Sequence, residues 1–243
     1  MPPDVRNRSL VFDFDGTLAY PKAPIGKDIS DRFGLILSVG RTCMGIITSA
    51  PAKDLRKRIP SVLWTFASSD NLILLPDGGT SRIPEGHPSP EPPGPSASSV
   101  DSLTALAKSV ARELGLPNPM RSMSGSQVLV SFTSETAAQQ SREGQARDAY
   151  FLLAGRANLG VNVYRAGQRS VSVVADNWNK LRALEWLATR WGIALEDLTY
   201  MGDDFGPGGN DEPIRNSAAH VVSVETPQET FLHVDALMKE EDL

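Results

Sequence analysis

The segment LVFDFDGTLAY, residues 10–20, runs an apolar strand straight into two carboxylates. Asp13 and Asp15 flank a single phenylalanine, and a Gly-Thr turn follows them. Leu10–Phe12 together with Phe14 predict a short buried strand. Because buried carboxylates are costly unless they are paired or bind a cation, this strand end indicates a functional site. The alternative is that Asp13 is only a turn residue.

The composition is that of an ordinary globular chain: 243 residues, 40% apolar and 22% charged. A net charge of -5 argues against a general nucleic-acid binder, which needs clustered positive charge. The single cysteine, Cys43, excludes an internal disulfide and a multi-cysteine metal site. There is no apolar run long enough for a membrane helix and no secretory signal at the start, so we expect a cytoplasmic protein without a membrane partner.

Strands and helices alternate in the two outer parts of the sequence. This order favours an α/β fold with a Rossmann-like parallel sheet. In the first part we predict strands at 10–14, 44–48 and 71–80, with helices at 28–42 and 52–60. In the last part we predict helices at 179–193 and 231–243, with strands at 198–204 and 219–225.

The alternation breaks at residues 84–95, which hold six prolines. This stretch is typical of a linker into an inserted domain, or of a long loop within one domain. Beyond it we predict a helix at 100–116 capped by Asp101 or Ser102, a strand at 126–132, a helix at 135–155 and a hairpin at 161–175. We therefore divide the chain into core residues 1–82 and 176–243, a linker 83–100, and a smaller inserted α+β domain 101–175.

Polar side chains follow three of the predicted core strands. Ligands of parallel α/β sheets bind at the carboxyl ends of strands, so these groups should converge. They are Asp13 with Asp15, Thr48 with Ser49, and Asp203 with Asp204, while Lys180 opens a helix nearby. Oxygen donors alone at a carboxylate cluster favour a hard cation, most simply Mg²⁺.

These residues resemble the four motifs of the haloacid dehalogenase superfamily of phosphotransferases. DFDGTL resembles the first motif, Thr48 and Lys180 the second and third, and GDDFGPGGND the fourth, in the right order along nearly the whole chain. The resemblance implies that Asp13 is the nucleophile that forms an aspartyl-phosphate, and that Asp15 is the general acid and base. It also implies that Thr48 donates to a phosphoryl oxygen and that Lys180 neutralises negative charge.

The resemblance further implies a Mg²⁺ site. Asp203 would bind the ion with Asp13 and the backbone carbonyl of Asp15, while Asn210 and Asp211 would orient Lys180 and support the metal site. The turn at Gly16 would bring the second carboxylate beside the first.

Several of these positions have a second interpretation. Ser49 competes with Thr48 as the hydroxyl that binds phosphate. Lys180 would otherwise be an ordinary lysine on a helix surface, and Asp211 a helix cap. Asp204 is more typical of a solvated carboxylate than of a direct metal ligand.

The insert lies between the third strand and Lys180, which resembles the superfamily branch with Cof-type caps. That branch includes phosphomannomutase, trehalose-phosphate phosphatase and sucrose-phosphatase, and its α+β caps cover the active site as a lid. GQRSVSVVADNWNK and GDDFGPGGNDEPI resemble the phosphomannomutases. IITSAPAKDLRKRIP resembles the trehalose-phosphate phosphatases, except that Ser49-Ala50 replaces the usual Gly-Arg.

A mutase must grip a second phosphate in its cap, and the family uses arginines there. Those arginines are not clearly present here. We therefore predict a Mg²⁺-dependent phosphatase acting on a small phosphomonoester, such as a phosphorylated sugar. Its substrate-binding candidates are Gly16, Ser49, Arg121, Arg165, Arg169 and Asn210, although each arginine could equally be a surface residue.

Two other functions stay open. A phosphomannomutase-like isomerase is the first. The second is a non-catalytic binding protein on the same fold, with the proline-rich segment as a partner ligand.

Overall fold

The structure is a computed structural model. It describes residues 9–39, 42–50, 52–64, 66, 72–76, 93–124, 127–132, 136–166 and 169–241. The linker predicted over 83–100 lies largely outside these residues, and of the proline-rich stretch only its last three positions are described. The domain boundaries given above stay predictions.

The core is a five-stranded sheet whose strands are all parallel, in the order β3-β2-β1-β8-β9. The predicted α/β fold with a parallel sheet is therefore confirmed. β1 lies at the centre because its short apolar run is buried on both faces, as parallel sheets require. The strands are β1 (Ser9–Phe12), β2 (Met44–Thr48), β3 (Leu72–Pro76), β8 (Leu198–Gly202) and β9 (His220–Ser223).

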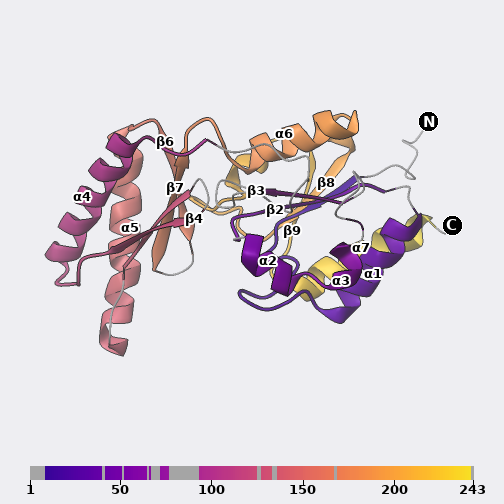
Figure 1. Cartoon of the computed structure of the whole chain (residues 1–243), viewed down its shortest axis with the longest axis horizontal. Coiled ribbons are helices and arrows are strands. Elements are labelled where there is room, and N and C mark those ends of the chain that lie inside the picture. The colour runs from indigo at the N-terminus through magenta and orange to yellow at the C-terminus, as the bar shows by residue number, and fades with distance from the viewer. Residues whose placement is uncertain are drawn as a thin grey trace.

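Helices cover both faces of this sheet (Figure 1). Leu10 and Phe12 pack on one side with residues of α1, α2, α3 and α7, and Val11 packs on the other side with α6. Alternate side chains of one strand thus serve two apolar layers. The helices are α1 (Lys27–Val39), α2 (Ala52–Arg58), α3 (Ser61–Trp64), α6 (Lys180–Trp191) and α7 (Pro227–Glu241), with 3-10 turns at Leu195–Asp197 and Glu212–Ile214.

The inserted part forms a separate α+β domain, as predicted. Its antiparallel sheet has the order β4-β5-β7-β6, and α4 and α5 pack on one face of it over a third apolar cluster. In Figure 1 these helices lie on the side of the sheet away from the core, so the other face is turned toward the core. The elements are α4 (Ala97–Glu113), β4 (Met120–Ser124), β5 (Gln127–Ser131), α5 (Ala137–Ala157), β6 (Val161–Ala166) and β7 (Ser170–Ala175). We call this domain the cap.

Two helix starts differ from the prediction. The Ser96 side chain caps α4 by accepting from Ser99 N at 3.2 Å, so the predicted caps Asp101 and Ser102 were wrong. The helix starts as soon as the prolines end, because Ser96 is the first residue that can cap it. The closing helix likewise begins at Pro227, four residues before its predicted start, because proline is well suited to a first turn.

Candidate active site

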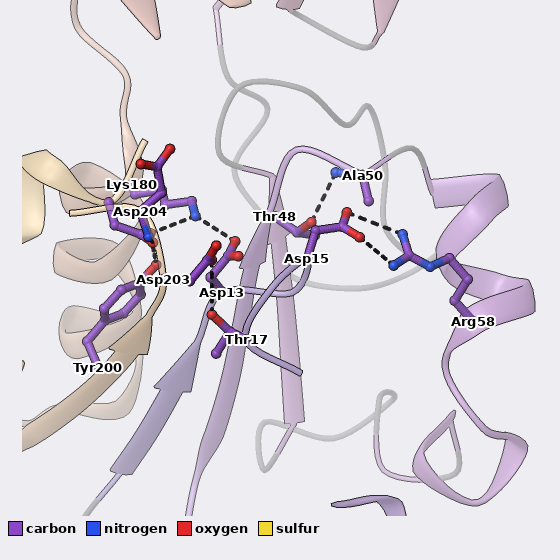
Figure 2. Close-up of polar contacts among 11 residues, drawn as sticks. Asp13, Asp15, Thr17, Thr48, Ala50, Arg58, Lys180, Tyr200, Asp203 and Asp204 are labelled. Atoms are coloured by element: carbon purple, nitrogen blue, oxygen red, sulfur yellow. Dashed lines mark hydrogen bonds and ion pairs between the residues drawn. The ribbon is translucent and has the colours of Figure 1, made fainter. Parts of the chain in front are cut away.

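Three neighbouring strand ends bring the predicted polar residues to one edge of the core sheet. β1 pairs with β2 on one side and with β8 on the other. Asp13 follows β1, Thr48 ends β2 and Asp203 follows β8. Figure 2 shows these side chains gathered at that edge, with Lys180 among them.

Lys180 is the centre of the cluster. Asn179 caps α6 by accepting from Arg182 N at 2.9 Å, which makes Lys180 the first residue of the helix. Its Nζ donates to Asp13 Oδ1 at 2.6 Å and to Asp211 Oδ1 at 2.7 Å. The lysine is 1% exposed, so it is not an ordinary surface residue. A buried ammonium is tolerated here because two carboxylates face it.

Asp211 holds the lysine from behind. It is fully buried, and its Oδ1 also accepts from Tyr200 OH at 2.5 Å, while its Oδ2 accepts from Asp204 N at 3.0 Å. With three protein donors on one carboxylate, Asp211 is suited to orienting Lys180. Gly202 allows this approach, because a Cβ there would lie 2.5 Å from Asp211 Oδ2.

Asp203 lies on the open side of the cluster. Its Oδ1 accepts from Thr17 Oγ1 at 3.3 Å, and its carboxylate packs against Gly16. Gly16 has φ +96°, and a Cβ there would collide with Asp203. Glycine is thus needed both for the turn and for the closeness of the first and fourth motifs.

The cluster has the electrostatics of a cation site. Oxygens of Asp13, Asp203 and Asp211 lie within 4.8 Å of one another. Burial raises the pKa of Asp13 well above its ordinary value; Lys180 opposes this, and Asp211 and Asp203 add to it. Partial burial and the Asp211 charge also raise the pKa of Asp203, although its side chain stays exposed on one side. Three carboxylates face one ammonium, so the donors and the surplus negative charge fit a hard cation such as Mg²⁺.

Asp15 points away from this cluster, toward α2 (Figure 2). Arg58 Nη2 donates to Asp15 Oδ1 at 2.5 Å, and Arg58 Nη1 donates to Asp15 Oδ2 at 3.2 Å. Both oxygens of the predicted acid and base are therefore held by one guanidinium. The expectation that the turn at Gly16 brings the Asp15 carboxylate beside that of Asp13 was wrong, because Arg58 draws it toward α2.

Thr48 and Ser49, the two candidate hydroxyls for binding phosphate, both lie at the carboxyl end of β2. Thr48 is 1% exposed at the end of β2, and its Oγ1 accepts from Ala50 N at 3.0 Å. This bond orients the hydroxyl and leaves its proton for an acceptor in the site. Ser49 is half-buried at the next position.

No protein-family model matches the chain, and no curated protein sequence does. Solved structures do. An IMP-bound, N-terminally truncated IMP-nucleotidase from Plasmodium falciparum matches with a TM-score of 0.71 and 17% identity, covering 95% of this chain and 68% of that one. The sucrose-phosphatase of Synechocystis sp. PCC6803, in complex with sucrose and phosphate, matches with a TM-score of 0.54 and 16% identity, covering 94% and 86%. A protein from Eubacterium rectale matches with a TM-score of 0.58 and 14% identity, covering 96% and 98%.

The chain has the haloacid dehalogenase fold. The matches span core and cap together, which confirms the predicted resemblance at the level of fold and includes the sucrose-phosphatase type of cap. No helix in the described part of the chain is both long and apolar enough to cross a membrane.

Within the haloacid dehalogenase fold, Arg165 joins the cap to the fourth motif. Its backbone N donates to Gly208 O at 2.8 Å, and its Nη1 donates to Pro207 O at 2.9 Å. The guanidinium carbon lies 5.1 Å from the ring centre of Phe151, which packs on Gly208, and Nε lies 3.7 Å from Asp148. Arg165 was expected to contact substrate, and the structure places it in a contact between the two domains.

The other two cap arginines contact carboxylates on the cap helices. Arg121 Nη1 donates to Asp101 Oδ1 on α4 at 2.9 Å. Arg169 Nε lies 3.7 Å from Glu143 Oε2 on α5. Asn210 is half-buried directly before Asp211 in the fourth motif, and its backbone N–H donates to the Asp204 carboxylate.

Sequence reasoning missed three residues of the site: Thr17, Arg58 and Tyr200. Arg58 ends a helix whose last turn holds three basic residues, and no pattern separates it from Arg56 and Lys57. Tyr200 lies in a strand that is buried throughout, where its hydroxyl looks like any other in an apolar run. Thr17 lies within the DFDGTL motif, but the motif predicted roles only for Asp13, Asp15 and Gly16.

Proposed function

We propose that the protein is a Mg²⁺-dependent phosphatase that hydrolyses a phosphorylated sugar or a similar polyol phosphate. One observation carries the proposal: the buried Lys180 ammonium bridges Asp13 and Asp211, beside Asp203, at the carboxyl ends of the core strands. A carboxylate held by a lysine in a cation-binding cluster is suited to attack on a dianionic phosphate, because the positive charges offset the repulsion.

In the first step one oxygen of Asp13 attacks phosphorus. Lys180 engages Oδ1, so we assign the attack to Oδ2. A new O–P bond forms as the ester P–O bond breaks, and the leaving alcohol oxygen takes a proton from Asp15. Thr48 donates its hydroxyl proton to a phosphoryl oxygen and keeps the transferred group in line.

In the second step water attacks the phosphorus of the aspartyl-phosphate. Asp15 takes the proton of that water, the bond between phosphorus and the Asp13 oxygen breaks, and inorganic phosphate leaves. Asp211 and Tyr200 keep Lys180 facing Asp13 through both steps.

Asp13, Asp203 and the backbone carbonyl of Asp15 would hold the metal ion, and Asp211 would support it from the rear of the cluster. Bound Mg²⁺ would neutralise negative charge on the phosphoryl oxygens and orient them. Thr17 and Gly16 fix the Asp203 carboxylate for this purpose.

The uncovered face of the cap sheet supports a hydroxyl-rich substrate. Alternate residues of β5 and β7 fill the cap core, so the residues between them point to the other face, toward the core domain. Two of them, Ser131 and Ser170, share a hydrogen bond of 2.9 Å. The neutral polar side chains of this face include Ser122, Ser131, Asn162, Tyr164 and Ser170, together with the buried Gln127 and Ser172.

The contacts of the cap arginines favour hydrolysis over a mutase reaction. A second phosphate needs a free cationic grip, whereas Arg121, Arg165 and Arg169 each face a carboxylate of the cap itself. A mutase would convert a hexose 1-phosphate into the 6-phosphate and would respond to a bisphosphate, and the phosphatase would release free sugar.

Phosphate release from a defined panel tests the proposal. The panel is glucose 6-phosphate, mannose 1-phosphate, sucrose 6-phosphate and IMP, each with and without Mg²⁺. We expect Mg²⁺-dependent release from at least one sugar phosphate, and a loss of about 10³-fold or more in Asp13→Asn. The surface variant Asp197→Asn, at an exposed position away from the cluster, should match wild type. Release from IMP alone would reject the sugar assignment, and activity that survives Asp13→Asn would reject the mechanism.

A further inference from the structure

The Arg58 side chain makes many contacts, although it ends the short helix α2. Its side chain is only 11% exposed. Besides its two bonds to Asp15, its Nε donates to Ala23 O at 2.7 Å and its Nη2 to Tyr20 O at 3.3 Å. Its guanidinium carbon lies 4.5 Å from the ring centre of Phe14. The loop that follows the DFDGTL motif is thus wrapped around one guanidinium.

A purely structural role would explain the bonds to Ala23 and Tyr20. It does not explain the bidentate grip on Asp15, whose side chain is 38% exposed and could be solvated without a partner. A planar guanidinium with two parallel N–H bonds fixes both the position and the plane of a carboxylate. The residue that receives this fixation is the one that must carry a proton to and from the reacting oxygens.

We propose that Arg58 is the positioning residue for Asp15 in the reaction, a role that rests on the proposed phosphatase function. The Arg58 guanidinium sets the direction from which the Asp15 carboxyl approaches the leaving oxygen. Arg58 does not contact the substrate, and it acts only through Asp15. In the structure the Asp15 carboxylate is turned toward Arg58 and away from Asp13 (Figure 2). Substrate binding must therefore turn one oxygen toward the phosphate while the other stays on the guanidinium.

The chemistry of the leaving group isolates this role. A sugar hydroxyl is a poor leaving group and needs a proton as the P–O bond breaks. p-Nitrophenolate leaves as a stable anion and needs none. The ratio kcat/KM reports the steps up to formation of the aspartyl-phosphate, so it senses departure of the leaving group and not the later hydrolysis. Misplacing Asp15 should lower kcat/KM for the sugar phosphate far more than for p-nitrophenyl phosphate.

Arg58→Lys is the test variant, because lysine keeps the charge and most of the stem but cannot make two parallel bonds. We expect kcat/KM for the best sugar phosphate of the panel to fall about tenfold or more, and that for p-nitrophenyl phosphate to fall less than about threefold. Arg56→Lys, the same exchange at an exposed position of α2, should match wild type on both substrates.

Equal losses on the two substrates would overturn the inference and leave Arg58 a structural residue, and so would no loss on either. A wild-type protein that releases phosphate from neither substrate would reject the phosphatase function, and the inference with it.

A second measurement covers the case in which Arg58→Lys does not fold. In a crystal structure of the wild type with Mg²⁺ and vanadate, Asp15 should contact both the apical vanadate oxygen and Arg58. An Asp15 carboxyl that has left Arg58 altogether would contradict the inference.

Discussion

The carboxyl-terminal edge of the core sheet and the cap sheet that faces it differ in how their charged side chains are used. At the core edge, Lys180 bonds Asp13 at 2.6 Å and Asp211 at 2.7 Å in a buried network, and Asp203 completes the three-carboxylate cluster that we propose to bind a cation. In the cap, the arginines expected to contact substrate face Asp101, Asp148 and Glu143 of the cap itself. The cap face turned toward the core is instead rich in hydroxyl groups. In the proposed function, charge at the core edge therefore carries out the reaction, and neutral hydrogen-bonding groups of the cap select the substrate.

Removing the lysine should have the largest effect. Lys180→Met leaves Asp13 and Asp211 as unpaired buried carboxylates, which costs about 3–5 kcal/mol of folding free energy. We expect turnover to fall about 10²- to 10³-fold because the nucleophile loses its main electrostatic support. Urea denaturation and phosphate release measure the two effects. Lys108→Met, an exposed lysine of the cap, should change neither. A fully active Lys180→Met variant would show that the core network does not organise the reaction.

The contact between the core and the cap can be disrupted by adding one methyl group at Gly208. Gly208 has φ +79°, and a Cβ there would run into the Phe151 ring of the cap. Gly208→Ala should cost about 1–3 kcal/mol through backbone strain, and it should raise KM by loosening the cap on the fourth motif. Gly206→Ala, whose Cβ would meet nothing within 4 Å, is the matched control. The same KM in both variants would mean that this contact does not hold the cap in place.

Two buried tyrosines give a finer comparison. In the core, Tyr200 OH bonds Asp211 at 2.5 Å; in the cap, Tyr150 OH is buried and has no hydrogen-bond partner among the residues that the structure describes. Tyr200→Phe should cost about 1.5–3 kcal/mol and lower turnover about tenfold, since it removes a bond to a charged group. Tyr150→Phe should be neutral or stabilise by about 1 kcal/mol, because the lost hydroxyl was unsatisfied. If the two variants behave alike in denaturation and turnover, the core hydroxyl has no special role.

The pH dependence of stability should show the smallest effect. Burial raises the pKa of Asp13, Asp203 and Asp204 above the ordinary value of 3.8, so the folded state holds protons that the unfolded state has lost. Their contribution to stability is therefore fully present below about pH 4 and is lost as the pH rises through the folded-state values. A cation that needs the ionised carboxylates should then raise the melting temperature more at about pH 8 than at about pH 5. Thermal melts with and without Mg²⁺ measure this, and Asp203→Asn should flatten the difference. A Mg²⁺ shift that does not grow with pH would contradict the cation-binding cluster.

Most residues of the candidate site could be predicted from the sequence because they lie at the ends of strands with clear apolar runs. Apolar runs place Asp13 and Thr48, and the parallel topology brings their ends together. Lys180 was also predicted, since it opens the helix before β8 and resembles the third motif. The contacts that Arg58 and Tyr200 make with the site carboxylates could not be predicted. Arg58 and Tyr200 reach the site across 43 and 11 residues of sequence, and only the folded chain shows whose hydroxyl or guanidinium meets a carboxylate.

The cap was predicted less well, for the same physical reason. β4 reads MRSMS and carries no apolar alternation, and it becomes a strand because it pairs with β5 along five residues. Arg165 looked like a substrate contact, since nothing in its surroundings predicts that its backbone bonds Gly208 more than 40 residues away.

The proposed mechanism depends most on Asp13, whose carboxylate oxygen forms a covalent bond to phosphorus. Acid quenching of the Asp15→Asn variant after mixing with Mg²⁺ and p-nitrophenyl phosphate, followed by peptide mass spectrometry, tests it most directly. This leaving group departs without a proton, whereas hydrolysis of the intermediate needs the Asp15 base, so the intermediate should accumulate. We predict one added phosphoryl group on the peptide that contains Asp13, and none in the double variant with Asp13→Asn. Steady turnover of p-nitrophenyl phosphate by the wild type with no phosphoryl group on that peptide in the Asp15→Asn variant would contradict the account.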